Sequence, residues 1–318
     1  MLTIGVDVGG TKCLGVVLDG NGNVVDEYRV PTPAGGRAVV DAIVTVVREL
    51  AGRRAGEATG AVAAVGVGVP GLVDDAGVLR FAPNLPGVVE LAVGPIVREQ
   101  LIGVTVVVEN DASCAGWAER QAGAARGHDH TVLVTLGTGI GGGIVLGGGL
   151  YRGAHGFAGE IGHMVVDPDG PRCPCGQRGC WERFASGSGL GRIAREAAHA
   201  GRAARIVELA GGDAENVKGE HVTAAAAEGD EDAGEVMAAY GWWVALGLAN
   251  LANVFDPELF VLGGGLVEAG DVLLTPVRTS FAELVEGVEH RPPIGIVAAT
   301  LGEHAGAIGA ALLARPRP

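Results

Sequence analysis

Short apolar runs alternate with helical patterns in the first part of the chain. Residues 2–8, 14–18 and 24–29 are rich in β-forming side chains and are separated by glycine-containing turns, which predicts three consecutive antiparallel strands. Apolar residues at helical spacing predict a helix over residues 37–50. A continuous apolar run that ends at a Pro-Gly pair predicts a buried strand over residues 62–69.

The same alternation of strand and helix continues to the end of the chain. Further strands are expected at residues 104–108, 131–136, 144–146 and 259–262, and further helices at 88–101, 190–200, 222–227, 233–255 and 305–314. A glycine-rich turn is expected over residues 137–143, between two of these strands. The small residues of the last helix would let it pack back on the N-terminal domain. This order indicates two related halves.

Composition supports an α/β protein. The 318 residues are 48% hydrophobic but only 4% aromatic, and the apolar residues are mainly Ala, Val and Leu, which is typical of parallel strands covered by helices. The net charge is −14 and the sequence lacks a Lys/Arg cluster, so nucleic acid and anionic membranes are not expected partners. The N-terminus does not read as a signal peptide, and a cytoplasmic location is expected.

Three glycine-rich turns follow predicted strands and are candidate phosphate sites. Glycine allows positive φ and close approach, so successive backbone amides can converge on an anion. A single turn of this kind is more often only a tight turn, and the presence of three favours a nucleotide. The residues concerned are Gly9, Gly10, Thr11 and Lys12, then Gly137, Thr138 and Gly139, and finally Gly263, Gly264 and Gly265.

Two commoner nucleotide motifs do not fit. The spacing before Lys12 is wrong for a P-loop. Gly137, Gly139 and Gly142 match GxGxxG, and Glu160 lies near the offset of a ribose-binding acid. A dinucleotide fold needs a helix after that turn, whereas here a β-rich run follows and predicts a hairpin. A dehydrogenase is therefore disfavoured.

Polar residues at strand ends are candidates for catalysis. Asp7 ends the first strand, where a carboxylate could hold Mg²⁺ through waters or simply cap a turn. Asn110 and Asp111 follow the strand at residues 104–108, where ligands of open α/β sheets bind, although one of them could N-cap a helix. Phosphoryl transfer to an alcohol needs a base, for which Asp111 is the candidate. Asn110 would then hold the alcohol substrate by hydrogen bonding, and Asn84 is a further polar residue in a turn.

The strongest local signal is a group of metal ligands. His163 is followed after nine residues by Cys173, Cys175 and Cys180. Three thiolates and one imidazole form a closed tetrahedral zinc site, which is structural because it leaves no position for water; free thiols are the alternative. Glu160 and Glu182 flank these ligands. A zinc-ordered loop would then present Glu160, His163 and Glu182 as a sugar-binding wall.

Taken together, these motifs resemble the ROK family of repressors, open reading frames and sugar kinases, and within it the bacterial ATP-dependent glucokinases. The resemblance extends over nearly the whole chain. Its motifs are GVDVGGTK at residues 5–12, VPG at 69–71, APN at 82–84, ENDA at 109–112, LGTGIGGG at 136–143, GEIGH at 159–163, CPCGQRGCWE at 173–182 and LGGG at 262–265. The cysteine motif is highly specific, whereas the glycine motifs are not. Cys13 and Cys114 are extra to the pattern and are interpreted as small core residues.

The resemblance implies a two-lobed actin-like, ribonuclease-H-like fold, with sugar and ATP in the cleft between the lobes. Residues 1–112 with a C-terminal helix at 303–318 would form the small lobe, and residues 113–302 the large lobe that carries the zinc loop. A homodimer or homotetramer is expected. The implied reaction is phosphorylation of glucose on its 6-hydroxyl by ATP, with Mg²⁺ as cofactor and zinc in a structural role.

The resemblance also implies site residues and leaves alternatives open. Asp111 would be the base, Asn84, Asn110, Glu160, His163 and Glu182 would bind the sugar, and His163, Cys173, Cys175 and Cys180 would bind zinc. N-acetylmannosamine, mannose and fructose are alternative substrates, and polyphosphate is a less favoured donor. A DNA-binding regulator is disfavoured because Asp7 already lies in the first strand, which leaves no room before it for a DNA-binding segment, and a non-catalytic sugar sensor is a further alternative.

Overall fold

The computed structural model describes residues 1–55, 61–82, 85 and 88–316. Contacts divide the chain into two compact units, which we call unit 1 (residues 1–129, 143–159 and 300–318) and unit 2 (residues 130–142 and 160–299). The contacts therefore place residues 113–129 and 143–159 with unit 1. The division into lobes after residue 112 stays a prediction.

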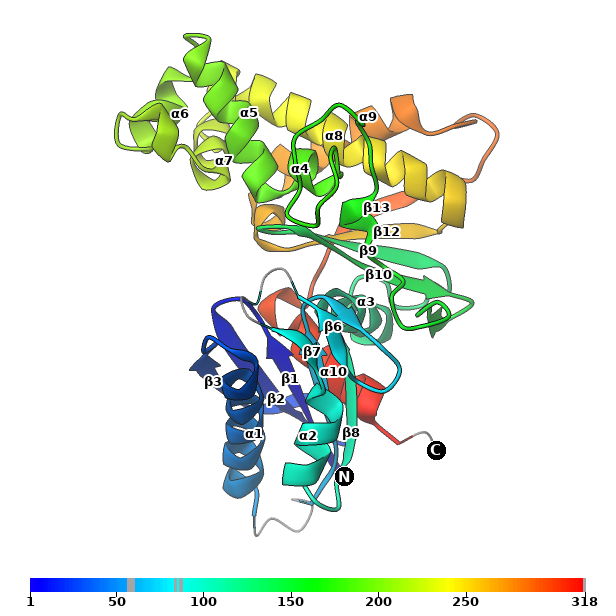
Figure 1. Cartoon of the computed structure of the whole chain (residues 1–318). Coiled ribbons are helices and arrows are strands. Elements are labelled where there is room, and N and C mark those ends of the chain that lie inside the picture. The colour runs from blue at the N-terminus through cyan, green and yellow to red at the C-terminus, as the bar shows by residue number, and fades with distance from the viewer. Residues whose placement is uncertain (56–60, 83–84, 86–87, 317–318) are drawn as a thin grey trace. The chain divides into compact units, whose positions relative to one another are not determined.

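Unit 1 is built on a mixed sheet with strand order β3-β2-β1-β4-β8 (Figure 1). Its first three strands pair antiparallel, as predicted, and β4 pairs parallel with both β1 and β8. The strands of this sheet are β1 (Leu2–Val8), β2 (Lys12–Leu18), β3 (Val24–Pro31), β4 (Val62–Val69) and β8 (Thr105–Asn110). The helices of unit 1 are α1 (Gly36–Arg53), α2 (Val93–Gln100), α3 (Asp111–Ala122), the 3₁₀ turn η4 (Gly302–His304) and α10 (Ala305–Ala314).

The prediction of one helix over residues 88–101 is wrong in its first part. A short strand, β7 (Val89–Leu91), precedes α2 and pairs antiparallel with β6 (Leu79–Phe81), which in turn pairs with β5 (Leu72–Val73). The apolar residues before α2 therefore complete a small sheet. Pro95 lies in the first turn of α2, where proline is tolerated, and it is the sequence signal for a helix that begins late.

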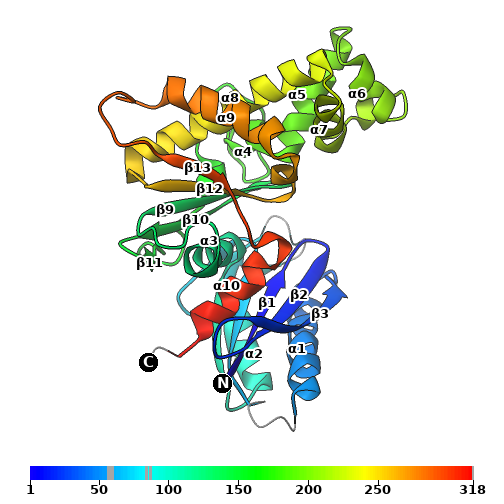
Figure 2. The ribbon, with the colours of Figure 1, turned by 180° about the vertical axis from the view of Figure 1, so that it is seen from behind.

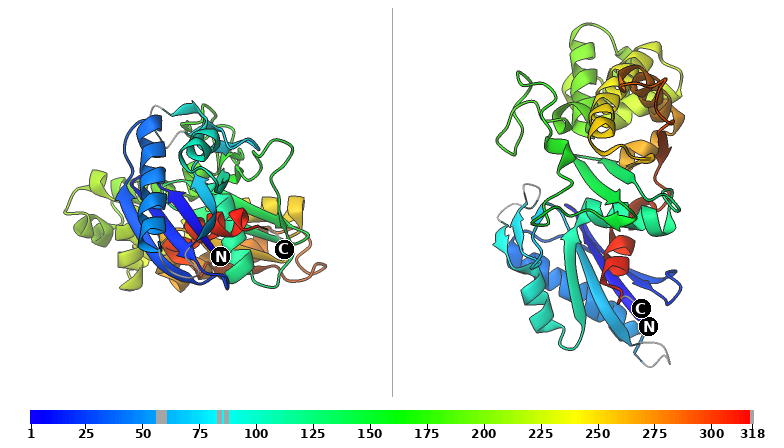
Figure 3. Two further views of the ribbon diagram at one scale, coloured as in Figure 1. Left: turned by 90° about the horizontal axis from the view of Figure 1, so that it is seen from below. Right: turned by 90° about the vertical axis from the view of Figure 1, so that its right-hand side faces the viewer.

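The two faces of the main sheet in unit 1 are covered by different helices. Side chains of β2 alternate: Val17 packs in a core cluster with residues of α1 and α2, whereas Val16 and Leu18 pack with α3 and α10. Figure 2 and Figure 3 show α1 and α10 on opposite sides of the blue strands. A Cβ on Gly5 would lie 1.8 Å from the Ala307 carbonyl oxygen, so α10 packs with its backbone against the sheet, as its small residues predict.

Unit 2 contains most of a second sheet, with strand order β11-β10-β9-β12-β13. The strands are β9 (Thr131–Leu136), β10 (Ile140–Leu146), β11 (Gly149–Leu150), β12 (Leu259–Gly263) and β13 (Gly295–Ala298). β12 pairs parallel with both β9 and β13. The predicted turn over residues 137–143 is too long, because β10 already begins at Ile140 and takes up three of the glycines as strand residues.

Helices of unit 2 pack around this sheet. They are α4 (Glu182–Ala185), α5 (Gly187–His199), α6 (Ala204–Leu209), α7 (Gly219–Ala227), α8 (Glu231–Phe255) and α9 (Asp271–Leu284), with 3₁₀ turns η1 (Ile161–His163), η2 (Ala214–Asn216) and η3 (Gly265–Ala269). The long helix α8 packs against α9, where Gly241 allows close approach to Pro276. No helix in the described part of the chain is long and apolar enough to cross a membrane.

Candidate active site

Two carboxylates lie at the carboxyl ends of two parallel strands in unit 1, β1 and β8. Asp7 is the last residue but one of β1, and Asp111 begins α3 directly after β8. Between them lies β4, where a Cβ on Gly68 would be 3.4 Å from the Asp7 Oδ1 atom and 3.5 Å from the Asp111 Cα atom. The sheet order and this glycine therefore bring the predicted base and the predicted cation-binding carboxylate close together. We call these two residues the acidic pair.

Burial shifts the ionisation of the acidic pair. It raises the pKa of Asp7 to about 8; the negative charge of Asp111 adds to this shift and the Lys12 ammonium opposes it. Burial also raises the pKa of Asp111, although the backbone amide of Ala112 donates a hydrogen bond of 2.8 Å to its Oδ1 atom and lowers the pKa. Each carboxylate is therefore costly to ionise until a cation or a positively polarised ligand is present.

The Asp7 carboxylate fits a cation. Within the described residues its Oδ1 atom is buried without a hydrogen-bond partner. A Cβ on Gly306, near the start of α10, would lie 2.6 Å from its carboxyl carbon, so the glycine provides the space that the carboxylate occupies. A buried, unpartnered oxygen is the type of ligand that Mg²⁺ or its bound water prefers.

Asn110 has a structural role. It is the N-cap of α3: its side-chain oxygen accepts from the Ser113 amide at 2.9 Å, and its Nδ2 atom donates to the Gly71 carbonyl at 3.2 Å. The capping alternative is therefore confirmed for this residue. One N–H of the side-chain amide is left over from these bonds, and binding of sugar by Asn110 stays a prediction. Asn84 lies outside the described residues.

The first glycine turn joins β1 to β2 in unit 1. The Gly9 amide donates to the Lys12 carbonyl at 2.9 Å, which closes the turn, and the Thr32 side chain donates to the Gly9 carbonyl at 2.7 Å. Gly10 is exposed, and a Cβ on it would meet nothing within 4 Å. The Lys12 ammonium forms an ion pair with Glu303. The backbone of the turn is thus open to an anion with a lysine beside it.

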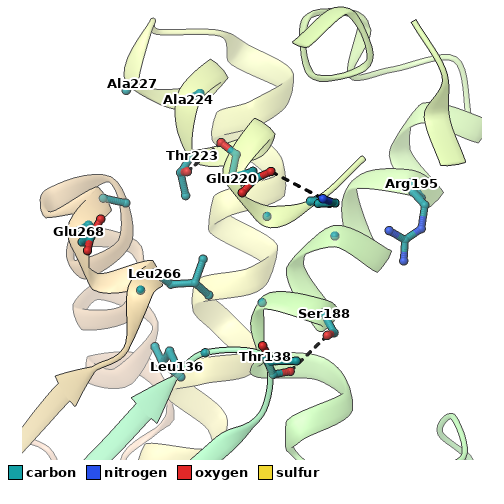
Figure 4. Close-up of a pocket in the computed structure, with 17 residues that line it drawn as sticks. Leu136, Thr138, Ser188, Arg195, Glu220, Thr223, Ala224, Ala227, Leu266 and Glu268 are labelled. Atoms are coloured by element: carbon teal, nitrogen blue, oxygen red, sulfur yellow. Dashed lines mark hydrogen bonds and ion pairs between the residues drawn. The ribbon is translucent and has the colours of Figure 1, made fainter. Parts of the chain in front are cut away.

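The second glycine turn borders a cavity of about 920 Å³ within unit 2. Gly137 and Thr138 form its floor, and α5 fixes them: the Gly187 amide donates to the Gly137 carbonyl at 2.8 Å, and the Ser188 hydroxyl donates to the Thr138 carbonyl at 3.2 Å (Figure 4). The volume suits a nucleotide, since ligand pockets commonly measure about 300–1,000 Å³.

The remaining walls of this cavity combine apolar and charged groups. Leu266, Ala224 and Ala227 supply apolar surface (Figure 4). Arg195 and Lys218 supply positive charge, and Glu220 and Glu268 supply negative charge. An aromatic base with an anionic chain needs apolar and positive surface. The Ser-Gly-Ser-Gly sequence that begins α5 was not predicted to contribute, although its glycines and its N-cap Ser186 are signals for such a site.

The three residues of the third glycine turn have different positions relative to the cavity. Gly265 lines the cavity, whereas Gly263 is the last residue of β12. Gly264 has φ +86° and a Cβ on it would lie 2.5 Å from the Leu136 carbonyl oxygen, so this glycine is needed for close packing against β9. Contact with nucleotide stays a prediction for all three residues.

The predicted metal ligands lie together in unit 2. The donor atoms of His163, Cys173, Cys175 and Cys180 are all within 4.8 Å of one another. The Sγ atoms of Cys175 and Cys180 are 3.6 Å apart, and the Cys173 Sγ atom is 3.8 Å from the His163 Nδ1 atom. Ligands of tetrahedral zinc with Zn–S bonds of about 2.3 Å are separated by roughly 3.8 Å, so the four side chains fit zinc.

The two nitrogens of His163 face different groups. Nδ1 faces the thiols, and Nε2 lies 3.8 Å from a carboxylate oxygen of Glu160. One imidazole can therefore serve both roles that were predicted for it, with one nitrogen for zinc and the other for a hydroxyl group.

Glu182 has a contact that sequence reasoning missed. Its Oε2 atom accepts a hydrogen bond of 3.0 Å from the backbone amide of Ile140, at the end of the second glycine turn. A Cβ on Gly139 would lie 2.3 Å from the same oxygen, so the carboxylate occupies the space beside that glycine. Nothing in the spacing of the motifs indicated this contact, because it depends on how the loop after Cys180 folds.

Comparisons with known proteins agree with the geometry. The sequence model described as ROK family matches residues 3–317. The chain is 42% identical over 317 residues to the glucokinase of Streptomyces coelicolor, covering 99% of this chain and 98% of the relative. It superimposes with a TM-score of 0.86 on a ROK family glucokinase from Streptomyces griseus in complex with glucose and AMPPNP, at 43% identity and 99% coverage of both chains.

A second solved structure gives the same result. The ROK hexokinase of Thermus thermophilus matches with a TM-score of 0.76 at 36% identity, over 99% of this chain and 98% of that one. These likenesses confirm the predicted fold class, the two-lobed actin-like ATPase fold.

Proposed function

This chain belongs to the ROK family, and we propose that it is an ATP-dependent kinase that transfers the γ-phosphoryl group of ATP to the 6-hydroxyl of glucose. The observation that carries this proposal is the likeness, over 99% of both chains, to a glucokinase whose structure contains glucose and AMPPNP. The buried acidic pair and the glycine-floored cavity supply the groups that such a reaction needs.

Asp111 is the general base. Its carboxylate accepts the proton of the C6 hydroxyl as the sugar oxygen attacks the γ-phosphorus; the bond from that phosphorus to the bridging oxygen breaks, and ADP leaves with the electron pair. Burial raises the pKa of Asp111 and so increases its basicity. The hydrogen bond that the Ala112 amide donates fixes the orientation of the Asp111 carboxylate.

The cavity in unit 2 is the nucleotide site. The Thr138 amide of the second glycine turn would meet phosphate oxygens, and the apolar wall around Leu266 would hold the base. In unit 1, the exposed backbone at Gly10 and the Lys12 ammonium form a second candidate surface for phosphate oxygens. These assignments follow from the apolar, polar or positive character of each surface.

Asp7 would hold Mg²⁺, directly or through water. Its unpartnered Oδ1 atom fits that role. Bound Mg²⁺ supplies positive charge that neutralises the phosphates during transfer. A bound cation would favour the ionised carboxylate of Asp7, whereas burial favours its protonated form when no cation is bound.

Glu160, His163 and Glu182 would bind sugar hydroxyl groups together with Asn110 and Asn84. Zinc on His163, Cys173, Cys175 and Cys180 would be structural, because four protein donors complete a tetrahedron and leave no position for a reacting water. We further propose that the protein acts in the cytoplasm as a homodimer in the first step of glucose breakdown.

The proposal is tested by ADP release across a panel of sugars. With ATP, we expect glucose to give the highest kcat/KM among glucose, mannose, fructose and N-acetylmannosamine. Polyphosphate in place of ATP is expected to give little product. ADP release that does not depend on any of these sugars would contradict the proposed function, and a preference for another sugar of the panel would correct its substrate.

A further inference from the structure

We propose that Glu182 is a positioning residue for the nucleotide site, in addition to any contact with sugar. This inference rests on the proposed function, since it assigns the turn at Gly137–Gly139 to phosphate binding. The contact that carries it is the hydrogen bond of 3.0 Å from the Ile140 amide to the Glu182 carboxylate.

The Glu182 carboxylate contacts the turn at two neighbouring residues, Ile140 and Gly139. Ile140 is the residue at which the turn becomes strand β10, so its amide fixes the point where the turn ends. The Glu182 carboxylate also fills the space beside Gly139, at 2.3 Å from where a Cβ would be. A larger residue at position 139 would exclude the carboxylate. The turn and the carboxylate are therefore fitted to each other.

The segment that carries Glu182 contacts the turn repeatedly. Within residues 180–188, Glu182 binds the Ile140 amide, the Gly187 amide donates to the Gly137 carbonyl at 2.8 Å, and the Ser188 hydroxyl donates to the Thr138 carbonyl at 3.2 Å. Cys180, a predicted metal ligand, begins this segment. The segment that directly follows the metal loop (residues 160–182) therefore holds the floor of the nucleotide cavity by hydrogen bonds.

Glu182 is itself held firmly by its neighbour. Trp181 is fully buried, its backbone amide donates to the Met164 carbonyl at 2.7 Å, and its indole N–H donates to the Trp243 carbonyl at 2.7 Å. A Cβ on Gly247 of α8 would lie 1.9 Å from the indole ring, so the helix leaves a groove for it. The fixed backbone at Trp181 limits where the Glu182 carboxylate can lie, and so the position in which it holds the Ile140 amide.

The charge of Glu182 and the hydrogen bond that it accepts should have opposite effects on nucleotide affinity. A carboxylate beside a phosphate-binding turn repels the phosphate, so the charge of Glu182 opposes nucleotide binding. The useful part of the contact is the hydrogen bond that the carboxylate accepts. Removal of the charge and removal of the acceptor should therefore change nucleotide affinity in different ways.

The experiment compares Glu182→Gln with Glu182→Ala by titration of AMPPNP and Mg²⁺ without sugar. Gln keeps an oxygen that can accept from Ile140 and has no charge, so its Kd for AMPPNP should equal that of the wild type or be lower. Ala removes the acceptor, and its Kd should rise about tenfold. Glu196→Ala, which removes an exposed carboxylate from α5, is the matched control and should leave the Kd unchanged.

Hydrogen exchange at the Ile140 amide gives a second measurement that needs no ligand. We expect this amide to be protected in the wild type and in Glu182→Gln, and to exchange faster in Glu182→Ala, while metal content stays at the wild-type value in all three. Equal AMPPNP affinity in Glu182→Ala and wild type would overturn the inference, as would equal weakening in both variants. Failure of the wild type to bind AMPPNP, with the exchange pattern as expected, would instead contradict the proposed function.

Discussion

The acidic pair of unit 1 and the metal loop of unit 2 (residues 160–182) hold their functional groups by different means. Asp7 and Asp111 stand at the ends of regular strands, and packing of α10 and Gly68 fixes them. Glu160 and Glu182 lie on either side of an irregular loop, where four metal-ligand side chains converge. Regular secondary structure positions the first pair, whereas side-chain chemistry must position the second. The two regions should therefore respond differently to the same kinds of change.

The largest effect is expected from Asp111→Asn. The amide cannot accept the hydroxyl proton, so kcat should fall by roughly 10³-fold, while the affinity for glucose and the zinc content stay near wild-type values. Steady-state kinetics, glucose titration and metal analysis measure the three quantities. Turnover near that of the wild type would remove Asp111 from the role of base.

Loss of the metal should affect the metal loop of unit 2. In Cys175→Ser the cluster has one thiolate fewer, and we expect loss of zinc, at least tenfold weaker glucose binding and a Tm lower by about 5–10 °C. Cys13→Ala removes a buried thiol from unit 1 and is the control, which should keep the full zinc content. Metal analysis by mass spectrometry and thermal unfolding check this. Absence of zinc from the pure wild-type protein would refute the metal assignment.

Packing against the acidic pair is tested by Gly306→Ala. The new methyl group would lie 2.6 Å from the Asp7 carboxyl carbon, so the carboxylate must move. We expect kcat/KM to fall about tenfold and stability to fall by about 1–2 kcal/mol, with zinc content unchanged. Gly234→Ala in α8, where a Cβ would meet nothing within 4 Å, is the matched control and should be neutral or slightly stabilising. Zinc loss in Gly306→Ala would show that a change at the acidic pair also disturbs the metal loop, which would contradict this comparison.

The smallest effect is a dependence of stability on pH. Burial, together with the charge of Asp111, raises the pKa of Asp7 from 3.8 to about 8 in the folded protein, so the folded state holds a proton that the unfolded state has lost. The stability from this group is present below pH 3.8 and is lost as the pH rises to about 8. Without Mg²⁺, Asp7→Asn should therefore be more stable than the wild type at pH 8, and the difference should shrink toward pH 4. Urea unfolding at several pH values measures it, and a difference that does not vary with pH would contradict the account.

The sequence predicted much of this fold because local patterns and tertiary packing agree. The strand at residues 62–69 and the helix at residues 305–314 were predicted with their observed bounds. Residues 88–91 were misassigned because apolar spacing does not distinguish a helix from an edge strand, and pairing of Leu91 with Leu79 decides it. Glycines 141–143 lie in β10, where Gly143 packs against Gly116 of α3, and not in a turn.

The candidate site was predictable where the chemistry is local. The spacing of three cysteines and one histidine indicated the metal cluster, and the four donors do converge. The cavity walls from α5 and α7 and the bond from Glu182 to Ile140 were not predicted. They join segments that are distant in sequence. The glycines and Ser186 at the start of α5 are a sequence signal for one wall, whereas no residue type or spacing marks the bond from Glu182 to Ile140.

The most direct test of the whole account is the identity of the product formed from glucose and ATP by the purified protein. Phosphorus and carbon NMR of the reaction mixture would show which sugar oxygen has acquired a phosphoryl group. We predict one phosphate monoester, on the C6 oxygen of glucose, with one ADP formed for each ester. Formation of ADP without a sugar phosphate, or a phosphate on another oxygen, would contradict the account.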